Sequence, residues 1–137
     1  MEAEAKNKVN LIYRSESYDI NGACMSVHRK LGAGFLESVY SEALSIEFER
    51  LDIPYEVEKK LDIYYGDIKL RKYFRADFIC YDSIVVEIKT TPYLTKLDEA
   101  QLINYLRATR LKLGILVTFG GASLIYKRLI NPNINKL

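Results

Sequence analysis

The sequence predicts a mixed α/β (α+β) fold in which helices pack on a mixed β-sheet. Three observations lead to this class. The chain has 137 residues and is 49% hydrophobic, which suffices for one hydrophobic core and is too short for two. Apolar residues recur at helical spacing in three segments and at strand spacing in others. The segments follow in the order helix, helix, several strands, helix and two strands, so helices must cover a sheet.

The first two predicted elements are amphipathic helices. Apolar residues recur at steps of three and four from Tyr18 to about Leu31, and Gly32 and Gly34 then end this first helix. A second apolar stripe runs from Leu36 to Leu51 and ends before Pro54.

Strands and one further helix fill the rest of the chain. Residues 55–89 are rich in Tyr, Ile and Val, with turn signals at 65–67 and 82–83, and read as three or four antiparallel strands. Thr95 and Asp98 have the spacing of a capping box and open a third helix that runs to about Arg110. Residues 114–118 and 124–128 supply two final strands.

Nothing in the sequence divides the chain. It has no repeat, low-complexity tract or Pro/Gly-rich linker, so we expect one domain over residues 1–137 with short polar tails at about 1–10 and 131–137. No apolar run is long enough to cross a membrane, and the charged start MEAEAKNK does not have the pattern of a secretory signal. We therefore expect no membrane partner.

Charge and cysteine content restrict the function classes further. Lys and Arg total 20 against 18 for Asp and Glu, so any site for a polyanion must be local rather than a property of the whole surface. Cys24 and Cys80 fall in a predicted helix and a predicted buried strand. This placement suits reduced core thiols rather than a disulfide or a metal site, and it favours a cytoplasmic location.

The strand VVEIKT, residues 85–90, carries an acid and a base two positions apart. Side chains alternate along a strand, so Glu87 and Lys89 share one face. In the preceding strand RADFICY, residues 75–81, Asp77 falls on the face opposite to Ala76, Phe78 and Cys80. The two strands therefore offer charged side chains that a suitable register would bring together.

The register of these two strands follows from their apolar residues. A strict two-residue turn at Asp82-Ser83 would set Phe78 opposite Glu87 and would mix apolar and charged partners. A three-residue loop, or one bulge, instead places Asp77 directly across from Glu87. We predict this second register because it alone gives a wholly apolar face, formed by Ala76, Phe78 and Cys80 against Ile88, Val86 and Ile84.

Two facing carboxylates repel each other, so something must compensate for the arrangement. A divalent cation would do so, and oxygen ligands in a small cluster suit Mg²⁺ or Mn²⁺. Lys89 beside such an ion could hold the attacking water and offset charge on a phosphate. The alternative is that Asp77, Glu87 and Lys89 form salt bridges on a solvated face of the sheet. These residues alone leave both interpretations open.

Two more sets of polar residues are candidates for the same site. On a helical wheel Glu37 falls inside the apolar arc of the second helix, where a carboxylate is costly without a cationic or metal partner. Glu47 also projects into that arc, about 15 Å along the helix, where a helix end could expose it. On the third helix Gln101 and Tyr105 share a face, and the alternative for them is a satisfied polar pair.

Four motifs in order resemble those of a known family. LGAGFLESVY contains Gly34-x-x-Glu37-x-x-Tyr40, and RADFIC, VVEIKT and EAQLINYL follow it. Together they resemble the GxxExxY protein family, a branch of the PD-(D/E)XK nuclease-like superfamily, over roughly residues 15–130. The proline of the superfamily's name is Ala76 in this chain.

The resemblance implies a restriction-endonuclease-like core of αβββαβ topology and a role for each motif. It implies that Lys89 is the catalytic lysine and that Gln101 and Tyr105 flank the site on a helix. It also implies metal ligands at the carboxylates of Asp77 and Glu87 and the carbonyl of Ile88, with Glu37 contributing directly or through water. These residues and Mg²⁺ (or Mn²⁺) make up the expected site.

The function that this resemblance implies is metal-dependent hydrolysis of phosphodiester bonds in nucleic acid, with DNA expected over RNA by analogy. The alternative is a catalytically idle module that keeps the nuclease fold and binds nucleic acid or a protein partner, a second copy in a homodimer included. Basic residues could meet phosphates, although their mixture with acidic residues favours ordinary solvated charge; they are Arg71, Lys72, Arg75, Lys96, Arg107, Arg110 and Lys112.

Overall fold

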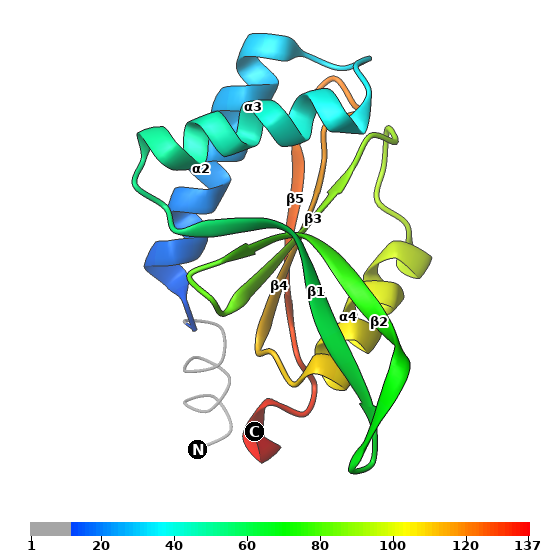
Figure 1. Ribbon diagram of the computed structural model, residues 1–137. Helices are drawn as coiled ribbons and strands as arrows, with labels where there is room; N and C mark the ends of the chain where they lie inside the picture. Colours follow the sequence, from blue (N-terminus) through cyan, green and yellow to red (C-terminus); the bar gives the residue numbers. More distant parts are fainter. Residues whose placement is uncertain (1–11) are drawn as a thin grey trace, which may run out of the picture.

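A computed structural model describes residues 12–137 of the chain. Five strands form one sheet in the order β1-β2-β3-β4-β5. Helices α2 and α3 lie together on one face of this sheet, and α4 lies on the other (Figure 1). The mixed α+β class predicted from the sequence is confirmed, with helices that flank a mixed sheet.

The three predicted helices are present. They are α2 at Arg14–Leu31, α3 at Glu37–Arg50 and α4 at Lys96–Thr109. Helix α2 begins four residues before Tyr18, and it ends where Gly32, at φ +67°, donates its backbone N–H to the carbonyl of His28. Glycine adopts this left-handed conformation without the steric cost that a side chain imposes, which explains the break between α2 and α3.

The strands follow the predicted order. Strands β1 (Tyr55–Tyr65), β2 (Ile68–Cys80) and β3 (Ile84–Lys89) are consecutive antiparallel neighbours. Helix α4 then crosses over to β4 (Leu113–Thr118), which lies parallel to β3, and β5 (Ile125–Ile130) is antiparallel to β4. This order contains the expected αβββαβ core, and a short 3-10 helix, η1 (Ile134–Lys136), follows it.

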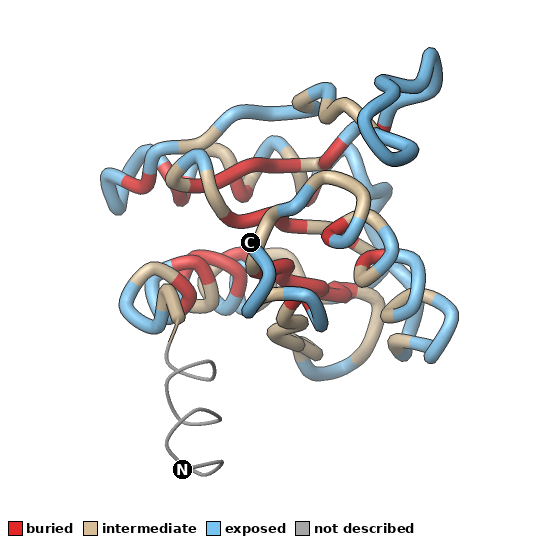
Figure 2. The backbone as a smooth tube through the Cα atoms, turned by 90° about the horizontal axis from the view of Figure 1, so that it is seen from below, coloured by how far each residue is buried: buried red, intermediate tan, exposed pale blue. Residues whose placement is uncertain are grey.

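Two apolar clusters hold the layers together, one on each face of the sheet. The first joins α2 and α3 to the sheet and contains Phe78, Val86 and Ile88. The second joins α4 to the sheet and contains Ala76 and Val85. Strand β3 is thus covered on both faces, as its near-continuous apolar sequence indicates. In Figure 2 the buried positions run through the middle of the molecule and the exposed ones lie around it.

The expectation that Ala76 shares a face with Phe78 and Cys80 is wrong. Ala76 belongs to the cluster under α4, whereas Phe78 and Cys80 belong to the cluster under α2 and α3. The alternation of side chains along β2 changes at Asp77. In the pairing with β1, Val57 lies opposite Phe78 and Lys59 lies opposite Ala76. Glu58 and Asp77, between these pairs, are not paired. Glu58 has a left-handed backbone, φ 51°, and irregularities of this kind locally re-aim a strand.

The expected polar tail at residues 131–137 begins with a buried residue, although five of the six residues after it are exposed. Asn131 is fully buried, and its side-chain amide donates to the carbonyls of Leu106 and Leu111, each at 2.9 Å. Residues 134–136 then form η1. The other expected tail, residues 1–10, lies outside the described residues.

Two smaller expectations concern the cysteines and the membrane. Cys24 and Cys80 are both free and buried, as predicted, and burial raises the pKa of the Cys80 thiol to about 12. In residues 12–137 no helix combines the length and the hydropathy that a membrane span requires.

Candidate functional site

The turn between β2 and β3 sets the geometry of the candidate site. It is a three-residue loop, residues 81–83, in which Tyr81 and Asp82 take left-handed backbones at φ 55° and 56°. Cys80 pairs with Ile84 and Phe78 with Val86, so the predicted register is confirmed for these residues. The ladder ends at the Phe78–Val86 pair, one residue before Asp77 and Glu87.

Beyond the ladder, side chains take the place of the backbone pairing. The backbone N–H of Asp77 donates to Oε1 of Glu87 at 3.1 Å, and the backbone N–H of Ile88 donates to Oδ2 of Asp77 at 2.8 Å. Each carboxylate is therefore held by a donor on the opposite strand. The structure brings Asp77 and Glu87 together across two strands, and their carboxylates satisfy two backbone donors where the strands separate.

The carbonyl of Ile88 lies on the same side of β3 as Asp77. The N–H of Ile88 points toward β2, because it bonds the Asp77 carboxylate. The N–H and C=O of one residue in a strand point to the same side, so this carbonyl also points toward β2. The carbonyl of the next residue, Lys89, points the other way and accepts the N–H of Phe119, the residue after β4, at 3.0 Å. Oxygen-bearing groups of Asp77, Glu87 and Ile88 therefore lie where β2 and β3 separate.

Proximity and burial change the acidity of both carboxyl groups. Burial, followed by the charge of Asp77, raises the pKa of Glu87 to about 8. Burial also raises the pKa of Asp77, against the opposing effect of the Ile88 hydrogen bond. Lys89 acts in the opposite direction on both groups. Without a bound cation, burial therefore opposes full ionisation of the pair, since two buried like charges cannot both ionise cheaply.

Lys89 is half-buried and faces the first turn of α4. Its Nζ lies 4.0 Å from Oδ1 of Asp98, while Oδ2 of Asp98 accepts the N–H of Thr95 at 3.0 Å. The predicted capping box of Thr95 and Asp98 is confirmed. The sequence assigns Asp98 only to this cap, and its position beside Lys89 was missed. The signal that was available is the capping box, which places Asp98 in the first turn of the helix that follows Lys89.

Gln101 and Tyr105 border the same side of the pair. Nε2 of Gln101 donates to the Tyr105 hydroxyl at 3.1 Å, and the Tyr105 ring stacks on Phe74 with centroids 3.7 Å apart. Both residues line a small, almost filled cavity together with Glu87 and Lys89. Gln101 itself is exposed, so the two residues form a polar pair at the rim of the site.

Glu37 differs from the expectation that it lies within an apolar arc. It is the first residue of α3 and is exposed, whereas Glu47 is the buried acid of this helix. Glu47 is held by Lys30 at 2.9 Å, and this hydrogen bond lowers the pKa of Glu47. A helical wheel gives the direction of a side chain around the helix axis but not its position along the axis. Glu37 points toward the core side of α3, but it lies at the start of the helix, before the first buried residue, Tyr40.

The carboxylate of Glu37 nevertheless reaches the surroundings of the pair. Partial burial and then the charge of Asp77 raise its pKa, and Lys89 opposes them. Glu37 and Asp77 line one cleft of about 390 Å³ between α3 and the β1–β2 strands. Glu58 lines it as well, and its charge raises the pKa of Asp77. No feature of the sequence indicated the left-handed backbone that turns Glu58 into this cleft.

Tyr40 fixes the loop that precedes Glu37. Its buried hydroxyl donates to the carbonyl of Gly32 at 2.5 Å and accepts the N–H of Phe35 at 3.3 Å. The Tyr40 ring stacks on Phe119, with centroids 4.7 Å apart. Gly34 takes φ +108° within the same loop. In Gly34-x-x-Glu37-x-x-Tyr40, the glycine and the tyrosine hydroxyl thus shape the loop, and Glu37 begins the helix that follows it.

The donor groups at the pair fit a hard divalent cation. Among residues 12–137, no three His, Cys, Asp or Glu side chains gather closely enough to hold an ion, so Glu37 is not brought in as a third direct ligand. Two carboxylates and one carbonyl remain. Mg²⁺ commonly binds through one or two carboxylates and completes its shell with waters and substrate phosphate. The donor set at Asp77, Glu87 and Ile88 suits such an ion.

Comparison with known proteins gives two positive findings. A family model described as the PD-(D/E)XK nuclease superfamily matches residues 14–129. The crystal structure of SSO0001 is similar to this chain, with a TM-score of 0.53 and 26% sequence identity. The match covers 69% of this chain and 50% of SSO0001, so the chain spans about half the length of that protein. No curated protein matches the sequence.

Proposed function

The chain belongs to the PD-(D/E)XK nuclease superfamily, and on that premise we propose that it is a metal-dependent nuclease acting on DNA. The superfamily indicates nuclease activity and nucleic acid as the partner, and its nucleases generally use divalent metals. The observation that carries the proposal is the reciprocal hydrogen bonding of Asp77 and Glu87 beside Lys89. Burying two neighbouring carboxyl groups costs free energy if they serve only the fold, whereas a metal site requires them.

The carboxylates of Asp77 and Glu87 and the carbonyl of Ile88 would hold Mg²⁺ or Mn²⁺. When bound, such an ion supplies Lewis-acid activation of phosphate and of water. The protein holds both carboxylates in place through backbone donors, so little reorganisation is needed when the proton of the pair leaves. Glu37, across the cleft from Asp77, would act through a water molecule, since it is not a third direct ligand.

Lys89 would position the attacking water and offset the charge that develops on the phosphate. Its ammonium group is near enough to lower the pKa of Asp77, Glu87 and Glu37. The only salt bridge that Lys89 makes in the described part of the chain is the long one to Asp98, at 4.0 Å. Its charge is thus held at the site but not neutralised there. Gln101 and Tyr105 would limit where Lys89 and the substrate can lie.

Two finer assignments accompany this proposal. DNA is preferred over RNA by analogy with the superfamily, and the substrate panel below decides between them. The two buried free cysteines support a reducing compartment, the cytoplasm.

The test is cleavage of labelled single-stranded, duplex and branched DNA, and of RNA, in Mg²⁺ or Mn²⁺. Wild type, Asp77→Ala and Lys89→Ala are compared with Lys127→Ala, which also removes an ion-paired lysine but lies on β5, bonded to Glu99 at 3.2 Å. We expect both site variants to lose cleavage and the control to retain it. Folded wild type that cleaves none of these substrates would contradict the proposal and favour an idle binding module.

A further inference from the structure

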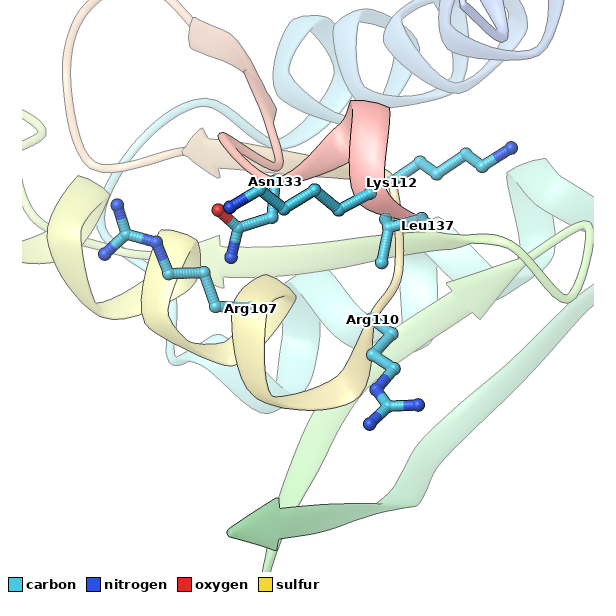
Figure 3. Close-up of a pocket in the computed structure, with 6 residues that line it drawn as sticks. Arg107, Arg110, Lys112, Asn133 and Leu137 are labelled. Atoms are coloured by element: carbon cyan, nitrogen blue, oxygen red, sulfur yellow. The ribbon is translucent and has the colours of Figure 1, made fainter. Parts of the chain in front are cut away.

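A second cationic region lies at the other end of α4. A hollow of about 680 Å³ opens there between the end of the helix and the last residues of the chain (Figure 3). No acidic side chain lines it. Four cations do, and we call them the basic surface: Arg107, Arg110, Lys112 and Lys136.

Within residues 12–137 none of these four cations forms a salt bridge, whereas seven other salt bridges are present. The dipole of α4 favours positive charge near the helix end, which accounts for Arg107 and Arg110. It does not account for Lys112, which precedes β4, or for Lys136 in η1. Cations from two separate parts of the chain, residues 107–112 and η1, therefore line one hollow that no acidic side chain lines.

The backbone beneath the basic surface is firmly held. Asn131 bonds the carbonyls of Leu106 and Leu111, its N–H donates to the carbonyl of Lys112, and its Oδ1 accepts the N–H of Asn133. Arg110 ends α4 with a left-handed backbone, φ 64°, a position where glycine or asparagine is usual. An arginine thus occupies a conformation that its own side chain disfavours, at the centre of the basic surface.

The directions of the side chains indicate the class of ligand. In Figure 3 Arg107, Arg110 and Lys112 extend away from one another instead of converging on one point. Converging donors suit a small anion, whereas cations spread over a surface suit a polyanion with regularly spaced charges. We infer that the basic surface binds the phosphate backbone of nucleic acid at a distance from the bond that is cut. This inference rests on the proposed function for the choice of nucleic acid.

The neighbouring hairpin adds aromatic groups to this surface. A second hollow, of about 300 Å³, lies between the end of α4 and the tip of the β1–β2 hairpin. Its lining residues are Thr109 and Arg110 on the helix side and Tyr64, Gly66 and Asp67 on the hairpin side. Tyr65, beside them, is 78% exposed. Exposed tyrosines next to cations can stack on bases while the cations meet phosphates. Asp67 is the one acid that lines this hollow. The combination of exposed tyrosines and cations favours nucleic acid over a lipid headgroup.

The basic surface is separate from the carboxylate pair. Arg107 lies nine positions after Asp98 in α4, which corresponds to about 14 Å along the helix. A duplex advances about 3.4 Å per base pair, so this length covers roughly four base pairs. The basic surface therefore contributes to affinity for longer substrates and not to the chemical step at a bound phosphate.

The test is fluorescence anisotropy with labelled duplex and single-stranded DNA, in EDTA so that no cleavage occurs. The probe is about 20 nucleotides long, well beyond the roughly four steps between the two regions. The variant Arg107→Gln/Arg110→Gln is compared with Arg14→Gln/Arg29→Gln, which removes two exposed arginines from α2 on the opposite face. Circular dichroism and thermal melting verify that all three proteins are folded.

We expect the α4 variant to bind at least about fivefold more weakly at roughly 50 mM salt, and the slope of log K against log salt to fall by about 2. The control should bind like wild type. Equal affinity of wild type and the α4 variant would overturn the inference. So would a wild type that binds phosphatidylserine vesicles but neither oligonucleotide.

This binding assay separates the inference from the proposed function. If wild type cleaves nothing yet its binding depends on Arg107 and Arg110, the nuclease proposal fails and the inference stands. If wild type cleaves nucleic acid while the α4 variant binds as tightly as wild type, the nuclease proposal stands and the inference fails.

Discussion

The carboxylate of Glu87 accepts the backbone N–H of Asp77 at 3.1 Å, at the point where β2 and β3 cease to pair. The Asp77 carboxylate makes the corresponding bond to the N–H of Ile88. Two acids thus replace two backbone acceptors, and they remain close together although the charge of Asp77 raises the pKa of Glu87. This pair leads to predictions about pH and metal, and two further predictions concern Tyr40 and Asn131.

The first prediction concerns pH. Folding raises the pKa of Glu87 from 4.5 to about 8, so between these values the folded state binds more protons than the unfolded chain. The free energy of unfolding contributed by Glu87 is therefore greatest in acid and falls as pH rises through this window. Glu87→Gln cannot ionise, so in EDTA it should gain stability over wild type as pH rises, by roughly 1–3 kcal/mol near pH 8.

Urea unfolding of both proteins near pH 5 and near pH 8 measures this difference. A constant difference across the two values would show that Glu87 titrates normally. A loss of stability in Glu87→Gln at the higher pH would instead indicate that a salt bridge of Glu87 with Lys89 dominates.

The second prediction concerns the metal. Mg²⁺ or Mn²⁺ that binds only folded protein raises its stability, by about 2.7 kcal/mol at 100 times the dissociation constant. Asp77→Ala and Glu87→Gln should lose this response. Binding must displace the proton of the pair, so the affinity should increase as pH rises toward about 8.

The matched control for the metal is Glu42→Gln. Glu42 is an exposed acid that lines the same cleft as Asp77. Its variant should respond to the ion like wild type when thermal melting is followed with increasing metal. Equal responses from Asp77→Ala and wild type would place the ion elsewhere.

The third prediction concerns Tyr40. Tyr40→Phe keeps the ring stacked on Phe119 but removes the hydroxyl that holds Gly32 and Phe35. We expect a loss of about 1–2 kcal/mol in the free energy of unfolding, because the carbonyl of Gly32 loses a buried donor. Tyr55→Phe is the control, since its hydroxyl bonds Glu49 at the surface and should matter by less than about 1 kcal/mol. Similar losses in the two variants would argue against a special role for the Tyr40 hydroxyl.

The fourth prediction concerns Asn131. Asn131→Ala leaves the carbonyls of Leu106 and Leu111 without their side-chain donor in a buried position. The expected cost is about 2–4 kcal/mol, measured by urea unfolding. Asn135→Ala, at an exposed position of η1, should change stability by less than about 0.5 kcal/mol. A variant of Asn131 as stable as wild type would show that residues 131–137 do not support the end of α4.

Local patterns in the sequence were sufficient for much of the fold. The register of β2 and β3 followed from the need to match Phe78 with Val86 and Cys80 with Ile84. Thr95 and Asp98 gave the start of α4 through their spacing. Both signals lie within a few residues of the feature that they specify, and tertiary packing does not override them.

Features that depend on distant packing were missed. Strict alternation placed Ala76 beside Phe78, but the left-handed backbone of Glu58 on the neighbouring strand goes with a change of phase at Asp77. A helical wheel placed Glu37 in the core, although the helix starts at that residue and the core begins later. Polarity suggested a tail at Asn131, whose donors instead cap the end of a helix that lies 20 or more residues earlier.

The central claim is that Asp77, Glu87 and Lys89 together perform metal-dependent phosphodiester hydrolysis. The most direct measurement is the single-turnover cleavage rate of wild type, Lys89→Ala and Lys127→Ala in Mg²⁺, on the substrate that wild type cuts best. We expect a loss of about 10²–10³-fold for Lys89→Ala, as for removal of one charge-stabilising group, and little change for Lys127→Ala. Cleavage by Lys89→Ala at the wild-type rate, or an undiminished rate in EDTA, would contradict it.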